Sequence, residues 1–254
     1  MYYNYEIIRL IYLSTKLSTK VNEMTKLLNR SKSPFGRSAC QDRSERTRQR
    51  LIEVAVEVFS ELGYEAASTR TIVERAQANL VSIPYYFGSK QGLYHASAEY
   101  IGAEVTGRFR PACDRARQGL AQAGLSRHQT LELFTEFMVD FAHVMLGTDA
   151  PDCWGQFILR EQSQPTEAFD ILHAHFSNIV DIGIEFVSRL TGRAVEAPAT
   201  KLQFMTTISM VLFTRTNRAS LLRTMEWKSI GEDERHLVEE ILRQNMHALY
   251  AHSA

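Results

Sequence analysis

The chain has 254 residues, of which 44% are hydrophobic and 23% are charged, so it can bury a sizeable core and is not a disordered polymer. The formal net charge of zero argues against a protein that coats nucleic acid over its whole surface. Residues 1–50 nevertheless carry 11 Lys and Arg against 4 Asp and Glu, and the remainder carries 18 against 25. A basic leading segment on a mildly acidic body indicates contact with a polyanion at one end only.

The N-terminal segment is interpreted as a flexible basic extension over residues 1–42. Its apolar residues between 7 and 13 are interrupted by Arg9, so this stretch is too short and too charged to span a membrane, and we expect no membrane partner. Met24 is an alternative natural start. The cysteines are odd in number and form no CxxC pair, which favours a cytoplasmic protein without a disulfide framework or structural zinc site. They are Cys40, Cys113 and Cys153.

Helical spacing is frequent and no strand-like alternation persists, so the predicted fold class is all-α. Apolar residues of the segment 47–63 fall on one helix face, and Gly63 ends it. Ser68 is the predicted N-cap of a helix over 69–76, and Asn79 that of a third short helix holding Leu80 and Ile83. The tight connection between the second and third helices predicts a helix-turn-helix.

The rest of the chain is predicted to consist of long helices. Ser89 caps one that runs toward Arg110, where Pro111 kinks or ends it. Glycines and prolines then separate further helices over about 127–146, 153–163, 166–190, 199–224 and 233–251.

The sequence TRTIVERAQANLVSIPYYFGSKQGLY, residues 69–94, resembles the DNA-binding domain of the TetR family of bacterial transcriptional repressors, and the match spans about 46–94. The segments FILREQSQPTEAFDILHAHF, 157–176, and LLRTMEW, 221–227, are similar to the ligand-binding domain of the branch called CerR-type. The resemblance implies a helix-turn-helix DNA-binding domain over 43–94 and a helical effector-binding and dimerisation domain over 95–254.

Double-stranded operator DNA is the partner that this resemblance implies. Thr69 and Thr71 at a helix N-terminus suit a phosphate, Arg70 reaches a base edge or a phosphate, and Lys90 a phosphate on the far side. By position in the family motif, a further group of residues is expected to face the DNA, with Tyr86 donating to a phosphate and Val81 meeting thymine methyls. The group comprises Leu80, Val81, Ser82, Pro84, Tyr85 and Tyr86.

Two residues depart from the family pattern. Gln77 stands where the family usually has Gly in a left-handed conformation, so either the residue is strained or the turn differs. Pro84 lies about five residues past the expected cap, where it removes a helical hydrogen bond, and we expect a distorted recognition helix with altered base preference. The rival interpretation is a small-molecule-binding or scaffolding helical dimer that has lost specific DNA binding.

In the body, aromatic residues and a mid-helix charge pair are candidates to bind an effector, although each singly can equally fill a helical core. They are Phe137, Phe141, Trp154, Phe157, Arg160, Glu161, Phe176 and Met205. The segment 202–213 is apolar nearly all round and, with the last helix, predicts half of an intersubunit four-helix bundle; the alternative is an intrachain core. The dimerisation candidates are Ile208, Val211, Leu212, Val238, Ile241 and Leu242.

Other chemistries find little support in the sequence. His173 and His175 point to different faces of a helix, so they predict no shared metal site. No GxSxG, HExxH or phosphate-binding Gly-rich motif occurs, so we expect neither an enzyme nor a cofactor. The function predicted from the sequence is therefore a TetR-like repressor, a homodimer that an unknown small-molecule effector releases from a near-palindromic operator.

Overall fold

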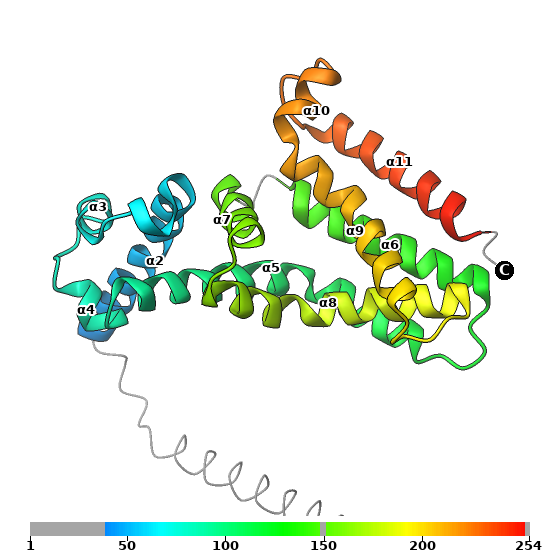
Figure 1. Cartoon of the computed structure of the whole chain (residues 1–254), viewed down its shortest axis with the longest axis horizontal. Coiled ribbons are helices and arrows are strands. Elements are labelled where there is room, and N and C mark those ends of the chain that lie inside the picture. Colours follow the sequence, from blue (N-terminus) through cyan, green and yellow to red (C-terminus); the bar gives the residue numbers. More distant parts are fainter. Residues whose placement is uncertain (1–38, 148–150, 252–254) are drawn as a thin grey trace, which may run out of the picture. The chain divides into compact units, whose positions relative to one another are not determined.

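The computed structural model describes residues 39–147 and 151–251, so the predicted extension lies almost wholly outside the described residues (Figure 1). The chain divides into two units, residues 1–46 and 47–254. Helix α2 (Ala39–Ala66) begins inside the segment predicted to be an extension. The described residues are helical throughout their regular structure, as the sequence predicted, and none of their helices is long and apolar enough to cross a membrane.

The head consists of α2, α3 (Thr69–Arg75), α4 (Ser82–Phe87) and the start of α5 (Lys90–Leu120). Gly63, with φ +81°, interrupts α2 as predicted, and one further turn runs to Ala66. Ser68 Oγ accepts from the Thr71 amide at 3.0 Å and Ser89 Oγ accepts from Gly92 at 3.0 Å, so both predicted N-caps are confirmed. The head's core is built from one face of each helix, including Leu51, Val56, Phe59, Ile72, Ile83 and Leu93.

The third helix starts later than predicted. Asn79 does not cap it; instead Asn79 Oδ1 accepts from the Val81 amide at 3.1 Å and the Asn79 carbonyl from Ser82 at 2.9 Å, which closes a turn before the helix. Because α4 begins at Ser82, Pro84 falls in its first turn, where an amide has no helical acceptor. The expected distortion by Pro84 was therefore wrong, because the recognition helix begins only two residues before the proline.

The body is formed by the rest of α5 with α6 (Arg127–Leu146), α7 (Asp152–Ser163), α8 (Glu167–Thr191), α9 (Pro198–Thr216), α10 (Arg218–Thr224) and α11 (Glu232–Tyr250). Helix α5 lies beside α8 and α6, α9 packs on α8 and α6, and α11 packs on α6 (Figure 1). At Gly183 of α8 a Cβ would come within 1.9 Å of the Phe204 ring, so only glycine allows α9 to approach this closely. The body's core therefore joins five helices, α5, α6, α8, α9 and α11.

Two predicted helix boundaries were wrong. The helix expected to end or kink near Arg110 continues to Leu120 with Pro111 inside it, because Phe109, Ala112 and Ala116 are buried on both sides of the proline and hold the helix in the core. The helix expected over 199–224 is two helices separated at Asn217. The predicted boundary between residues 94 and 95 lies inside the continuous helix α5.

Candidate nucleic-acid interface

The turn of the helix-turn-helix is closed by backbone hydrogen bonds around Gln77. The Ala78 amide donates to the Val73 carbonyl at 2.9 Å and the Gln77 amide to Glu74 at 3.2 Å, the pair of bonds of a Schellman motif. Gln77 itself has φ +52°, in the left-handed region that a residue with a Cβ rarely adopts. Of the two expectations for this position, the strained residue is the one observed, and the turn keeps its left-handed form without a glycine.

Large apolar side chains extend into solvent from the third helix and the turn before it. Leu80 is 54% exposed, Val81 67% and Tyr85 78%, while Ile83 is buried and anchors α4 in the head's core. Three neighbouring apolar groups on so small a domain are costly to leave in water unless a partner covers them. These residues are three of those predicted to face DNA, and the structure brings them together on one exposed surface.

Tyr86 and Phe87 differ from Tyr85 because both are half-buried against the head's core. The Tyr85 and Tyr86 rings meet edge to face with centroids 4.8 Å apart, which fixes how the exposed ring is held. The Arg48 guanidinium lies 5.6 Å from the centre of the Phe87 ring. Of the three consecutive aromatic residues, Tyr86 and Phe87 are therefore anchored in the head and Tyr85 is exposed to solvent.

The predicted phosphate-contacting residues are already engaged within the head. The Thr71 hydroxyl is 2.8 Å from Ser68 Oγ, and Thr69 is half-buried beside it. Arg70 pairs with Glu74 at 2.9 Å, and this bond raises the pKa of the exposed guanidinium. A second exposed pair joins two further residues, Arg75 and Glu61.

Lys90 occupies a specific position at the start of α5. Its ammonium group donates to the Glu65 carbonyl at 3.2 Å and lies 4.5 Å from the centre of the Tyr64 ring. An ammonium group has three N–H donors, so one bond to a carbonyl leaves donors for a phosphate. The contact nevertheless ties Lys90 to the end of α2, which the sequence did not reveal.

The predicted effector residues do not line one common cavity. Phe137 and Phe141 pack edge to face on Phe109 in the body's core, with ring centroids 4.9 and 5.5 Å away. Phe157 lies against the Tyr94 ring, and Phe176 is half-buried between the two hydrophobic clusters of the molecule. Of the eight candidates, Trp154 and Met205 line a cavity of about 480 Å³ among α5, α6, α7, α9 and α10. Arg160 and Glu161 line another cavity, of about 940 Å³, between α7 and the end of α2.

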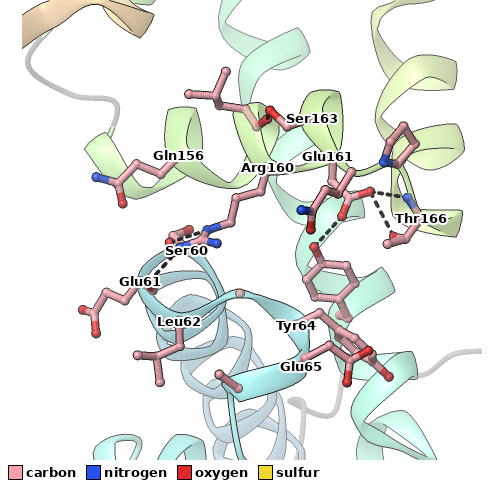
Figure 2. A pocket seen from close by; sticks show the side chains of 16 residues that line it. Ser60, Glu61, Leu62, Tyr64, Glu65, Gln156, Arg160, Glu161, Ser163 and Thr166 are labelled. Atoms are coloured by element: carbon pink, nitrogen blue, oxygen red, sulfur yellow. Dashed lines mark hydrogen bonds between the residues drawn. The ribbon is translucent and has the colours of Figure 1, made fainter.

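Arg160 and Glu161 bind the head and not each other (Figure 2). The Arg160 guanidinium donates to the carbonyls of Ser60 and Glu61, both at 2.9 Å, just before α2 is interrupted at Gly63. A cation at the C-terminal end of a helical run is favourable, because carbonyl groups there lack helical donors. Helix α7 is thus attached by a charged side chain to the first helix of the head.

The Glu161 carboxylate is buried and accepts several hydrogen bonds. The Tyr94 hydroxyl donates to it at 2.5 Å, and the amide and hydroxyl of Thr166 donate at 3.0 and 2.9 Å (Figure 2). Burial, followed by the bond to this carboxylate, raises the pKa of Tyr94 well above its ordinary value. The sequence indicated that these mid-helix charges need partners, but the partners lie far away in the sequence.

The predicted dimerisation residues divide between core and surface. Ile208, Val211 and Leu242 are buried in the chain's own core, and Leu212 and Val238 are half-buried. Ile241 is 47% exposed. Other exposed apolar side chains occupy the same two helices: Leu202, Met205 and Phe213 on α9, with Leu237 and Leu249 on α11. An all-round apolar helix does not reveal in its sequence which face a neighbour covers.

Within the described ranges no group of three or more His, Cys, Asp and Glu side chains is placed to hold a metal ion. His175 Nε2 lies 2.6 Å from the Glu99 carboxylate where α5 and α8 pack, while the His173 ring lies tilted against Phe169 with centroids 6.0 Å apart. The two histidines thus have separate surroundings.

Two family descriptions match the chain. The first, "Bacterial regulatory proteins, tetR family", matches residues 51–97, and the second, "HTH-type transcriptional dual regulator CecR, C-terminal domain", matches residues 131–252. The branch called CerR-type above is therefore the CecR branch. The transcriptional dual regulator CecR of Shigella flexneri is 27% identical over 199 residues, which cover 78% of this chain and 88% of that protein.

Two further likenesses are to a second relative and to a solved structure. The nicotine-responsive transcriptional repressor HdnoR of Paenarthrobacter nicotinovorans is 33% identical over 92 residues, 36% of this chain and 45% of that one. Among solved structures, a transcriptional regulator from Rhodococcus sp. Rha1 superposes with a TM-score of 0.55 at 11% identity, covering 79% of this chain and 96% of that one. At this identity the superposition shows a common fold.

Proposed function

Since the chain belongs to the TetR family of DNA-binding transcriptional regulators, in the branch with a CecR-type C-terminal domain, we propose that it is a repressor released from a near-palindromic operator by a small-molecule effector. The family consists of regulators and not of enzymes, and its partner is DNA. The rival interpretation, a dimer that has lost DNA binding, relied on Gln77 and Pro84. The turn around Gln77 is closed and Pro84 lies in the first turn of α4, which favours the regulator over that rival.

The exposed surface of Leu80, Val81 and Tyr85 supports base contact. Apolar side chains on the leading end of a recognition helix suit thymine methyl groups in the major groove, and a tyrosine hydroxyl suits a base edge or a phosphate. Tyr86, anchored in the head beside Tyr85, and Lys90 then contact phosphates. We assign the preference for particular DNA sequences to Leu80, Val81 and Tyr85, and the affinity for the DNA backbone to the charged and hydroxyl groups around them.

The observation that carries effector control is the position of α7. One face of this helix contributes Trp154 and Ile158 to the cavity of about 480 Å³. Two other residues of the same helix, Arg160 and Glu161, hold the head. A ligand that shifts α7 therefore alters contacts with both α2 and α5 of the head. Differential binding to two positions of α7 needs to supply only about 1–3 kcal/mol to change DNA affinity appreciably.

The proposed assembly is a homodimer through α9 and α11. The exposed apolar side chains on these helices, including Leu202, Phe213 and Ile241, are best buried against a second copy. A two-fold dimer places two heads on successive major grooves about one helical turn apart, which accounts for a near-palindromic operator. Ile208, Val211 and Leu242 are excluded from the proposed interface, because the chain's own core covers them.

Selection of bound sequences from random duplex DNA at near-physiological salt tests the proposal. The intact protein is expected to enrich a near-palindrome, and Tyr85→Ala to weaken binding to it by about tenfold, since one good base contact is worth about 1–3 kcal/mol. Tyr85→Phe is the matched control that keeps the ring and removes the hydroxyl. A folded dimer that enriches no sequence, or a Tyr85→Ala variant of unchanged affinity, contradicts the proposed interface.

The direction of regulation needs its own measurement. The Shigella relative is named a dual regulator, and the Paenarthrobacter relative is named a repressor. With the selected operator placed across a promoter, the protein is expected to reduce transcription in a purified system. Increased transcription from that template would show that the chain acts as an activator there.

A further inference from the structure

We propose that the cavity among α5, α6, α7, α9 and α10 binds an organic anion, a carboxylate with an apolar aryl or alkyl body, whose acid group lies among three arginines. The inference rests on the proposed effector function of this cavity and gives the chemical class of its ligand. Its volume of about 480 Å³ is in the range of sites for drug-sized molecules.

The walls of this cavity are mainly apolar. They are formed by side chains from four helices: Val105, Met145, Trp154, Ile158, Met205 and Leu212. Methionine side chains adapt to flat or flexible hydrocarbon groups, tryptophan offers a flat apolar ring, and covering them removes apolar surface from water. The walls therefore suit the body of the ligand and leave its orientation to the polar groups.

The charged groups that line the cavity are predominantly basic. Arg108, Arg215 and Arg218 contribute positive charge, and Asp152 is the acidic residue among the described lining residues. Arginine presents a planar fork of donors that matches a carboxylate. An excess of positive charge in a mostly apolar cavity favours an anion over a neutral or cationic ligand.

Arg215 is held in place by the fold. Its guanidinium donates to the carbonyls of Met145 at 2.5 Å and Pro151 at 3.0 Å. It lies against α7 at Gly155, where a Cβ would come within 2.7 Å of Arg215 Nε. Carbonyl groups fix the guanidinium but do not neutralise it. Burial lowers the pKa of Arg215, the nearby Asp152 carboxylate raises it in part, and Arg218 adds to the lowering. Arg215 is thus a pre-oriented cation that gains from an anionic partner.

Arg108 reaches the same cavity from α5. Its guanidinium lies 4.6 Å from the centre of the Trp154 ring and 3.5 Å from Glu104. The stack positions a cation directly beside Trp154, the aromatic residue among those that line this cavity. An aryl or alkyl carboxylate can therefore cover Trp154 with its body while its acid group faces the arginines.

Fluorescence of Trp154 provides the test. The chain contains two tryptophans, so Trp227→Phe leaves Trp154 as the single reporter. The probes are 4-phenylbutyrate and decanoate, each compared with its own neutral amide in the full-length protein. We expect each carboxylate to bind at least about tenfold more tightly than its amide, because hydrogen bonds to charged groups are the stronger ones. Amides that bind as tightly as the acids, or no binding by either carboxylate, would overturn the proposal.

Charge-neutral variants locate the acid group. Arg218→Gln is expected to weaken carboxylate binding by about tenfold and leave amide binding unchanged. Arg218 is chosen over Arg215 because Arg215→Gln would also remove the hydrogen bonds to the Met145 and Pro151 carbonyls. Arg223→Gln, at an exposed position of the same helix that does not line the cavity, is the matched control. Equal loss in both variants, or in neither, contradicts the assigned position of the anion.

The effector role is separated by measuring operator affinity with saturating probe. If a carboxylate binds but operator affinity is unchanged, the ligand class holds and the effector function fails. If neutral amides bind preferentially and reduce operator affinity, the effector function holds and the anionic class is wrong.

Discussion

Replacing Glu161 by Gln tests the attachment of α7 to the head. The carboxylate is 2% exposed and accepts bonds from the Tyr94 hydroxyl and from the amide and hydroxyl of Thr166. A Gln side chain keeps one acceptor oxygen, and its NH₂ group faces the Tyr94 hydroxyl, which can rotate to accept. The variant therefore preserves the number of partners and removes the charge from their bonds.

The expected loss of unfolding free energy is about 1–2 kcal/mol for Glu161→Gln. Charge-assisted bonds contribute about 1.5–3 kcal/mol each against about 0.5–1.5 for neutral ones, and the lower desolvation penalty of the neutral amide offsets part of the difference. Tyr94→Phe leaves one carboxylate oxygen without its buried donor, at a cost of about 2–3 kcal/mol. Because the two side chains share one bond, the double variant should lose less than the sum by about 1 kcal/mol.

Urea unfolding followed by circular dichroism at neutral pH and fixed protein concentration measures these losses. Glu167→Gln is the control, an exposed acid on the neighbouring helix, expected to change stability by no more than about 0.5 kcal/mol. A Glu161→Gln variant as stable as the parent, or strictly additive effects of Glu161→Gln and Tyr94→Phe, would refute the reasoning.

Three other outcomes are expected. Gln77→Gly should raise the unfolding free energy by about 0.5–1 kcal/mol, because relief of left-handed backbone strain exceeds the entropy cost of glycine. Gln77→Ala should give no such increase, and urea unfolding midpoints of the two variants decide this. The stability advantage of the parent over Tyr94→Phe should be constant below pH about 9 and shrink above about 10. The pKa of Tyr94 is raised in the folded state, so this tyrosine favours folding only while its unfolded counterpart remains protonated. Equilibrium unfolding across this pH range tests the prediction. Ile241→Asp should give folded monomers by sedimentation, whereas Ile208→Asp should unfold the chain; folded monomers from the latter would place Ile208 at the interface instead.

The head was largely predictable because its signals are local. Ser68 and Ser89 cap the helices that follow them, and the residues that accept or donate those bonds lie three positions away. The left-handed position of Gln77 follows from a turn that closes within six residues. The start of α4 was missed, because Asn79 can close a turn with the same groups with which it caps a helix.

The sequence by itself determined an all-helical chain with a helix-turn-helix head, since helix periodicity, caps and turns depend on neighbours within a few residues. Only the tertiary structure decided which face of α9 lies in the core, because a helix that is apolar on all sides carries no hydrophobic pattern that marks one face as buried. It also decided that Pro111 lies within a continuous helix, where packing on both sides outweighs one lost hydrogen bond. The tertiary structure also decided the partners of Arg160 and Glu161, because a buried charge needs a hydrogen-bonding group that the fold brings close to it. Here these groups are the Ser60 carbonyl and the Tyr94 hydroxyl of the head, which lie far away in the sequence.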